Sequence, residues 1–177
     1  MARFATKDVI TPAGVKVLAA LAALKSRPHV KVGVLQADFD QPKAEDKAMG
    51  KGKNAKPPQF AKITTLGVVA VANEFGTDTI PERSFIRSTH DENAEKWREE
   101  TDKLREKVIE GSMSTEVALK RLGTIIKSAI QAKIRSNIPP PNAPETEARK
   151  HSSNTLINTG QLLNGIDYEV HLEGGRK

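Results

Sequence analysis

Histidines and neighbouring acidic residues are the side chains of this chain best suited to chemistry. The histidines are His29, His90, His151 and His171. They do not have the spacing of a metal site, such as two histidines four residues apart on a helix. The pairs Glu99–Glu100 and Glu145–Glu147 have the residue type that hydrolysis uses. Hydrolysis also needs two acids in opposed environments, and nothing in the sequence separates these pairs from solvated surface charge.

Nucleophilic and nucleotide chemistry also lack a motif. The chain contains no cysteine, which excludes thiolate catalysis and disulfides, and it has no G-x-S-x-G elbow. The string Gly50-Lys51-Gly52-Lys53 has the residue types of a phosphate loop without its spacing. We therefore predict that the protein is not an enzyme and uses neither a cofactor nor a metal.

The elements that would position any site are predicted from hydrophobic periodicity. Thr11-Pro12 begins an amphipathic helix, with apolar positions at Val15, Leu18, Leu21, Ala22 and Leu24. Apolar residues alternate over 29–35 and again over 166–172, as in half-buried strands. We expect these two strands to pair, although they lie near opposite ends of the sequence.

Helical patterns occupy much of the middle of the chain. One helix starts near residue 64 and ends at Gly76, which supplies a left-handed turn. A long polar helix begins between Ser84 and Asp91 and stops at Gly111, and a more apolar one runs from about 114 to 136 and packs centrally. A short helix is expected around 159–165. The predicted fold is α+β, with a small antiparallel or mixed sheet packed against two long helices.

The 177 residues are expected to form a single domain with three irregular segments. Residues 37–62, rich in Lys, Pro and Gly, have too little apolar surface to offset ordering and are predicted to be a flexible insertion or hairpin arm. Residues 137–155 are predicted to be a proline-rich loop, and 173–177 a disordered tail. The arm is expected to contact partners through Lys43, Lys47, Lys51, Lys53 and Lys56.

Charge and hydropathy restrict the class of partner. The 28 basic and 22 acidic residues leave a net charge of +6, spread along a chain with few aromatic residues. A specific nucleic-acid binder would concentrate this charge in a stripe with stacking aromatics, so we expect only non-specific proximity to DNA. The sequence has neither a signal-peptide core nor an apolar run long enough for a membrane span, which predicts no membrane partner.

Three short motifs resemble a family of virion proteins. Residues 73–77 read N-E-F-G-T, residues 80–85 read I-P-E-R-S-F and residues 156–162 read L-I-N-T-G-Q-L. Together they resemble the neck and tail-completion proteins of tailed bacteriophages, the family typified by the tenth gene product of phage HK97. This chain has Asn73, Ser84 and Asn158 where the family frequently has His, Pro and Asp.

The resemblance implies a structural, head-tail joining role in the virion. It predicts a ring of copies, six-fold in the virion, that meets head-completion or connector proteins on one side and the tail terminator or tail tube on the other, and lets DNA pass. The protein would be made in the host cytoplasm. The alternative roles are a tail terminator that caps the tail tube and a basic DNA-binding protein. We expect the isolated chain to be monomeric or weakly associating, with the ring completed only on a partner surface.

The motifs supply the predicted interaction residues of this virion role. Arg83 is expected to meet a carboxylate of a neighbouring subunit, whereas Phe85 has two alternatives, contact with a neighbour and packing in its own core. The full set of predicted interaction residues is Glu74, Phe75, Gly76, Ile80, Pro81, Arg83, Phe85, Thr159, Gly160 and Leu162.

Overall fold

The order of helices and strands gives an α+β fold, as the sequence predicts. The computed structural model describes residues 12–35, 65–150 and 153–173, and the account below refers to these. The elements are α1 (Pro12–Lys25), β1 (His29–Val34), α4 (Leu66–Phe75), α5 (Arg87–Ile109), α6 (Thr115–Arg135), α7 (Pro144–Lys150), α8 (Gln161–Asn164) and β2 (Ile166–His171). The predicted arm over 37–62, with its five lysines, and the tail from residue 174 lie outside the described residues.

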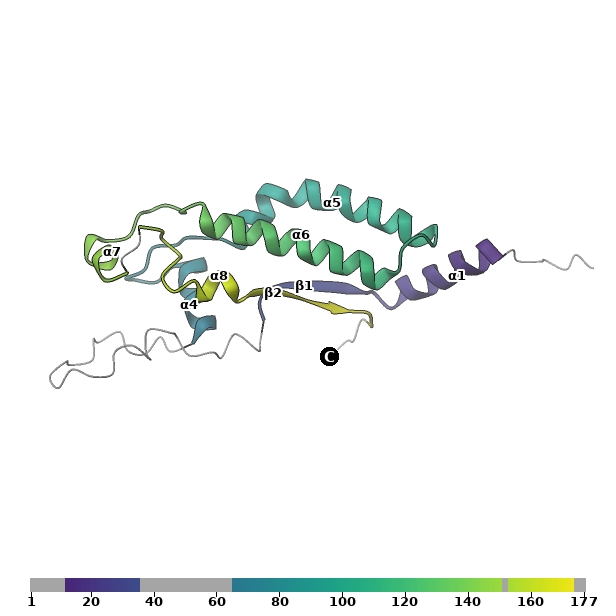
Figure 1. The fold of residues 1–177 in the computed structure, drawn as a ribbon, viewed down its shortest axis with the longest axis horizontal. Coiled ribbons are helices and arrows are strands. Elements are labelled where there is room, and N and C mark those ends of the chain that lie inside the picture. The colour runs from purple at the N-terminus through teal and green to yellow at the C-terminus, as the bar shows by residue number, and fades with distance from the viewer. Residues whose placement is uncertain (1–11, 36–64, 151–152, 174–177) are drawn as a thin grey trace, which may run out of the picture.

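The sheet consists of β1 and β2, which pair in antiparallel register. Val30 lies opposite Val170, and Val34 lies opposite Ile166. The prediction that these distant segments pair is therefore confirmed. The pairing also brings α8 and the loop before it close to α4, because α8 leads directly into β2 (Figure 1).

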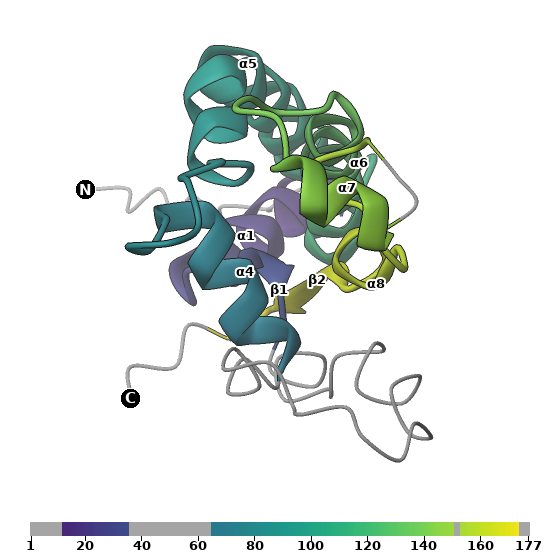
Figure 2. The same cartoon turned by 90° about the vertical axis from the view of Figure 1, so that its left-hand side faces the viewer.

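Helix α6 is the central element of the molecule. It packs against both strands on one face and against α5 on another, so that α5, α6 and the sheet follow one another as layers (Figure 2). Ser114 caps its start, where the hydroxyl oxygen accepts a hydrogen bond from the backbone N–H of Val117 at 3.2 Å. Gly123 lets the sheet come close, since a Cβ there would lie 2.6 Å from the Tyr168 ring.

Buried apolar residues form two clusters. The larger joins α4, α6, α8, β2 and the loop before α5, and consists of Leu66, Ala70, Phe85, Ile130, Ile134, Leu156, Leu162 and Ile166. The smaller consists of Leu104, Val108 and Ala118, where α5 and α6 meet, and Ala20 of α1 packs against it. The core therefore has one part under the motif segments and another where α1 packs against α5 and α6.

Helix α1 differs from the predicted amphipathic helix. Among its described apolar side chains, Val17, Ala20 and Leu24 are half-buried, whereas Val15, Leu18 and Leu21 are exposed. The prediction was wrong about the buried face because α1 is apolar all round, so that periodicity alone does not decide which side packs.

The proline-rich segment over 137–155 contains helix α7, where the sequence analysis predicted a loop. Pro144 is the first helical residue, and Glu145 and Glu147 lie in the first turn. Proline is favoured at that position because its missing N–H is not needed, and acidic residues there complement the positive end of the helix. The run of prolines before it stays irregular.

Candidate functional site

The carboxylate of Glu74 ties the end of α4 to the start of α5. Glu74 is 4% exposed, and its two oxygens accept hydrogen bonds from three successive backbone N–H groups. These donors are Phe85 at 2.8 Å, Ile86 at 2.9 Å and Arg87 at 2.9 Å. The first N–H groups of a helix have no partner inside it, so Glu74 caps α5 from another element.

Side chains complete the contacts of Glu74. The Ser84 hydroxyl donates to it at 2.8 Å and the Arg87 guanidinium at 3.1 Å. Burial by itself raises the pKa of Glu74, but the hydrogen bonds from Ile86, Arg87, Phe85 and Ser84 outweigh it, and the pKa lies below its ordinary value. The Glu74 side chain is therefore a buried anion that holds the fold together. Its carboxylate is not exposed for the partner contact that the sequence analysis predicted.

Gly76 turns the chain out of α4. Its φ of 74° is in the region that favours glycine, and a Cβ there would lie 3.0 Å from the backbone nitrogen of Glu82. The loop that follows returns to α4, since the Arg83 N–H donates to the Asn73 carbonyl at 2.7 Å. The I-P-E-R-S-F segment is consequently a closed loop with its tip outward and its last residues inward.

Arg83 fixes this loop to the proline-rich segment. Its guanidinium donates to the carbonyl oxygens of Pro140 at 2.8 Å and Pro141 at 3.1 Å, and the residue is only 5% exposed. Burial lowers the pKa of Arg83 below its ordinary value. The expectation that Arg83 meets a carboxylate of another subunit is thus corrected, because two carbonyls of its own chain occupy the guanidinium.

The segment before α8 is held by a second set of backbone contacts. The side-chain oxygen of Asn154 accepts from the N–H groups of Leu156 and Ile157 at 3.1 and 3.0 Å. The Thr155 hydroxyl donates to the Ile138 carbonyl at 2.9 Å, and the Lys150 ammonium donates to the Thr155 carbonyl at 3.1 Å. The proline-rich segment therefore bridges the I-P-E-R-S-F loop and the start of the L-I-N-T-G-Q-L segment.

These contacts leave an open groove of about 490 Å³ where the three motif segments meet. Apolar side chains and polar amides and hydroxyls both line it, and its cations are Arg83 and Lys150, which already donate to carbonyls. The lining residues are Val69, Asn73, Thr79, Ile80, Pro81, Arg83, Pro141, Asn142, Ala143, Thr146, Lys150, Thr155, Leu156, Asn158 and Leu162. No Asp, Glu or His is among these described residues, so the groove is suited to contacts with amides and apolar side chains.

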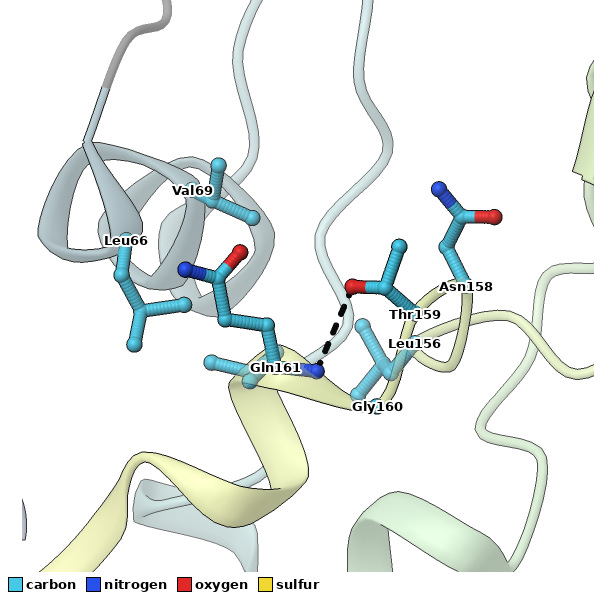
Figure 3. A pocket seen from close by; sticks show the side chains of 8 residues that line it. Leu66, Val69, Leu156, Asn158, Thr159, Gly160 and Gln161 are labelled. Carbon is cyan, nitrogen blue, oxygen red and sulfur yellow. Dashed lines mark hydrogen bonds between the residues drawn. The ribbon is translucent and has the colours of Figure 1, made fainter. Parts of the chain in front are cut away.

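A smaller cavity of about 60 Å³ adjoins the groove between α4 and α8. Figure 3 shows Leu66 and Val69 of α4 on one side and the segment from Leu156 to Gln161 on the other. The Thr159 hydroxyl accepts from the Gln161 N–H at 3.4 Å, and Gly160, with a φ of 78°, precedes α8. Leu162 lines both hollows.

The predicted interaction residues thus divide by position. Ile80, Pro81 and Leu162 line the groove, and Thr159 and Gly160 line the adjoining cavity. Phe85 is fully buried, so the alternative that it packs in its own core is the one the structure has. Phe75 is exposed, with the Arg87 guanidinium 4.5 Å from its ring centre.

Sequence reasoning missed what the proline-rich segment and its surroundings contribute. Thr146 and Lys150 of α7 line the groove, together with Asn142 just before this helix. The structural role of Glu74 had a signal, since it is the only charged residue in the largely apolar helix Leu66–Phe75. A lone acid in such a helix indicates a specific buried partner.

Two of the histidines, distant in sequence, come together in the sheet. His29 and His171 are register partners, and their rings stack with centroids 4.9 Å apart. Among the described residues no group of three or more potential ligands could hold a metal ion. None of the described helices is both long and apolar enough to span a bilayer.

Comparison with known proteins identifies no relative of this chain. Family models, curated proteins and solved structures were all searched, and none matches the chain.

Proposed function

We propose that the protein is a structural virion subunit of a tailed phage, which forms a ring at the neck or upper tail and joins head to tail. The observation that carries this proposal is the meeting of the three motif segments at one groove. They span residues 73 to 162 of the sequence, and residues from all three line the same hollow. The resemblance thereby corresponds to a single place in the fold.

The lining supports docking of a protein segment. The groove combines apolar residues such as Val69, Ile80 and Leu156 with the side-chain amides of Asn142 and Asn158. An extended chain presents the same two classes of group, and a few well-placed polar groups give orientation to an apolar contact. The groove of each subunit is proposed to take a segment of a head-completion or connector protein.

Hydrogen bonds within the chain also hold the walls of the groove in place, which favours docking. Arg83 and Asn154 hold the walls through carbonyl and N–H groups of their own chain. A site whose walls are fixed before binding loses less entropy when the partner arrives. The proposal therefore assigns Arg83 and Asn154 to holding the walls, and the exposed or half-buried lining residues, such as Thr79, Asn142 and Asn158, to partner contact.

The experiment is complementation of a parent phage that lacks this gene. Asn158→Arg puts a long cation into the groove at a residue with half-buried surface, and we expect folded protein but unjoined heads and tails in electron micrographs. Glu99→Arg, which puts the same side chain on the exposed face of α5, is the matched control and should restore joined particles.

The outcome also decides between the neck and terminator roles. Absence of a neck protein leaves tails of normal length beside filled heads, whereas absence of a terminator leaves tube growth uncapped and tails of irregular length. Particles that join and infect normally without the gene would contradict both roles.

A further inference from the structure

Helix α1 exposes an apolar face that nothing in the described chain covers. The helix has two charged residues, Lys16 and Lys25, among fourteen. Its largest exposed side chains are Val15, Leu18 and Leu21, which are 55, 52 and 43% exposed. A helix that is apolar on every side is ordinarily buried on every side, so this face is a candidate contact surface.

Helix α4 exposes a second apolar face of similar size. Val68, Val71 and Phe75 follow one another at steps of three and four residues and are 42, 49 and 59% exposed. Their opposite neighbours Leu66, Ala70 and Ala72 are buried in the core. We call the two surfaces the α1 face (Val15, Leu18, Leu21) and the α4 face (Val68, Val71, Phe75).

The two faces cannot cover each other within one chain. The α1 helix projects from one end of the long axis, whereas α4 lies towards the other end, beyond the sheet (Figure 1). Viewed along that axis, α4 is in front and α1 is behind (Figure 2). Any apolar partner of these faces must therefore come from outside the described chain.

Size argues that one copy uses both faces. Three half-exposed side chains offer on the order of 200–300 Å² of apolar surface, whereas a stable interface takes about 800 Å² from each partner. A symmetric pair through the α1 face would bury one small patch and leave the α4 face in water. Head-to-tail contact buries both faces of every copy in a chain or ring of copies.

Charge agrees with this pairing. All the charged residues of α1 are basic, and Arg27 follows the helix. The loop that follows α4 carries the exposed acidic residues Asp78 and Glu82, and Glu82 also pairs with Arg87, whose guanidinium lies over Phe75 of the α4 face. Two α1 faces brought together would join two surfaces whose charged residues are all basic, whereas an α1 face on an α4 face brings basic and acidic residues to the rim of one contact.

We propose that the α1 face of one copy docks on the α4 face of the next copy. The partner is a second copy of this chain, and the contact is asymmetric. Closure of the contacts into a ring rests on the proposed virion function, but the contact itself is a property of the purified protein. Because each face is small, association of the free protein is weak and needs trapping to be seen.

Disulfide trapping tests the pairing, because the chain has no cysteine of its own. Leu18→Cys and Val71→Cys are prepared as separate variants, mixed at high concentration and oxidised. We expect disulfide-linked dimers in the mixture at least about tenfold above either variant alone, which is a preference of about 1.4 kcal/mol. Val71→Cys mixed with Glu99→Cys, on the exposed face of α5, measures random collision.

A ladder of multimers from the doubly substituted chain, Leu18→Cys with Val71→Cys, would further support head-to-tail contact. Dimers of Leu18→Cys alone that exceed those of the mixture would overturn it in favour of a symmetric pair. A yield of the mixture no higher than the Glu99→Cys control would overturn it as well. A yield no higher than that control is also what we expect if another part of the chain or another protein occupies these faces, and the proposal is wrong in that case too.

The complementation assay separates this inference from the proposed function. If trapping fails while Asn158→Arg still blocks head-tail joining, the pairing of α1 with α4 is wrong and the virion role stands. If trapping succeeds while particles join without the gene, the pairing stands and the virion role is wrong.

Discussion

Replacement of Glu74 by glutamine is the sharpest test of how the motif segments are held. The carboxylate accepts five hydrogen bonds, from Ser84 Oγ, from the N–H groups of Phe85, Ile86 and Arg87, and from Arg87 Nε. Glutamine has nearly the same shape but keeps one acceptor oxygen and turns the other into a donor. At least two donors then face an NH2 group.

The expected loss of unfolding free energy follows from these contacts. An unsatisfied buried donor costs about 1–3 kcal/mol, and loss of a negative charge at a helix start costs about 0.3–1 kcal/mol. Water reaches part of the site, because Arg87 is exposed. We therefore expect Glu74→Gln to lower the free energy of unfolding by about 3 kcal/mol, which lowers Tm by about 6–12 °C for a chain of this size.

The pH dependence gives a second signature. The folded pKa of Glu74 lies below its ordinary value of 4.5, so its contribution to stability is complete above that pH and is lost as pH falls through the folded pKa. Urea unfolding of the natural and Glu74→Gln chains should differ most at neutral pH. The difference should narrow below pH 4.5, since only the natural chain has this carboxylate to protonate.

Glu82→Gln is the matched control. Its carboxylate contacts the same Arg87 at 2.6 Å, but the side chain is 56% exposed, so the change should cost less than about 1 kcal/mol. If Glu74→Gln costs no more than Glu82→Gln at neutral pH, or if the difference does not narrow in acid, the buried-cap explanation is refuted.

Two further substitutions test the walls and the core. Arg83→Lys should lower the free energy of unfolding by about 1–2 kcal/mol in urea titration, because one ammonium cannot reproduce the forked contacts with Pro140 and Pro141; equal stability would contradict this role. Gly123→Ala should destabilise by about 1–2 kcal/mol despite the better helix propensity of alanine, because its Cβ would lie 2.6 Å from the Tyr168 ring. Ser128→Ala, exposed on the same helix, should stay within about 0.5 kcal/mol, and Gly123→Ala as stable as that variant would show that the sheet shifts freely.

Local patterns predicted the elements well where one physical signal dominates. Alternation located β1 and β2, the apolar stripe over about 114–136 located α6, and the positive-φ Gly111 marked the end of α5. The pairing of the two strands also followed, because they are the two clear alternating runs. The buried face of α1 did not follow, since its apolar residues encircle the helix and the choice of face depends on α5 and α6.

The candidate site was predictable as a set of segments and not as a set of contacts. Turn residues such as Gly76 and Pro81 indicate irregular backbone, but the direction that the chain takes after the turn depends on contacts with residues far away in sequence. Arg83 finds its carbonyls 57 and 58 residues on, and Asn142 contacts Asn154 across α7. Charged residues in a loop suggested surface contact, whereas burial with full hydrogen bonding is how a protein accommodates such groups in its interior.

The burial of the motif residues changes what the resemblance can mean. Glu74, Arg83 and Phe85 are the most specific residue types of the first two motifs, and all three are buried within the chain. Glu74 and Phe85 do not line the groove and Arg83 is only 5% exposed there, so each acts mainly by setting the position of a wall or a helix start. Sequences that share these residues would share the groove's shape, whereas the partner they accept would depend on exposed or half-buried lining residues such as Thr79, Asn142 and Asn158. Exchange of those three residues between two such proteins should therefore transfer partner choice without loss of stability, whereas replacement of a buried residue, as in Glu74→Gln, should lower stability without transferring partner choice.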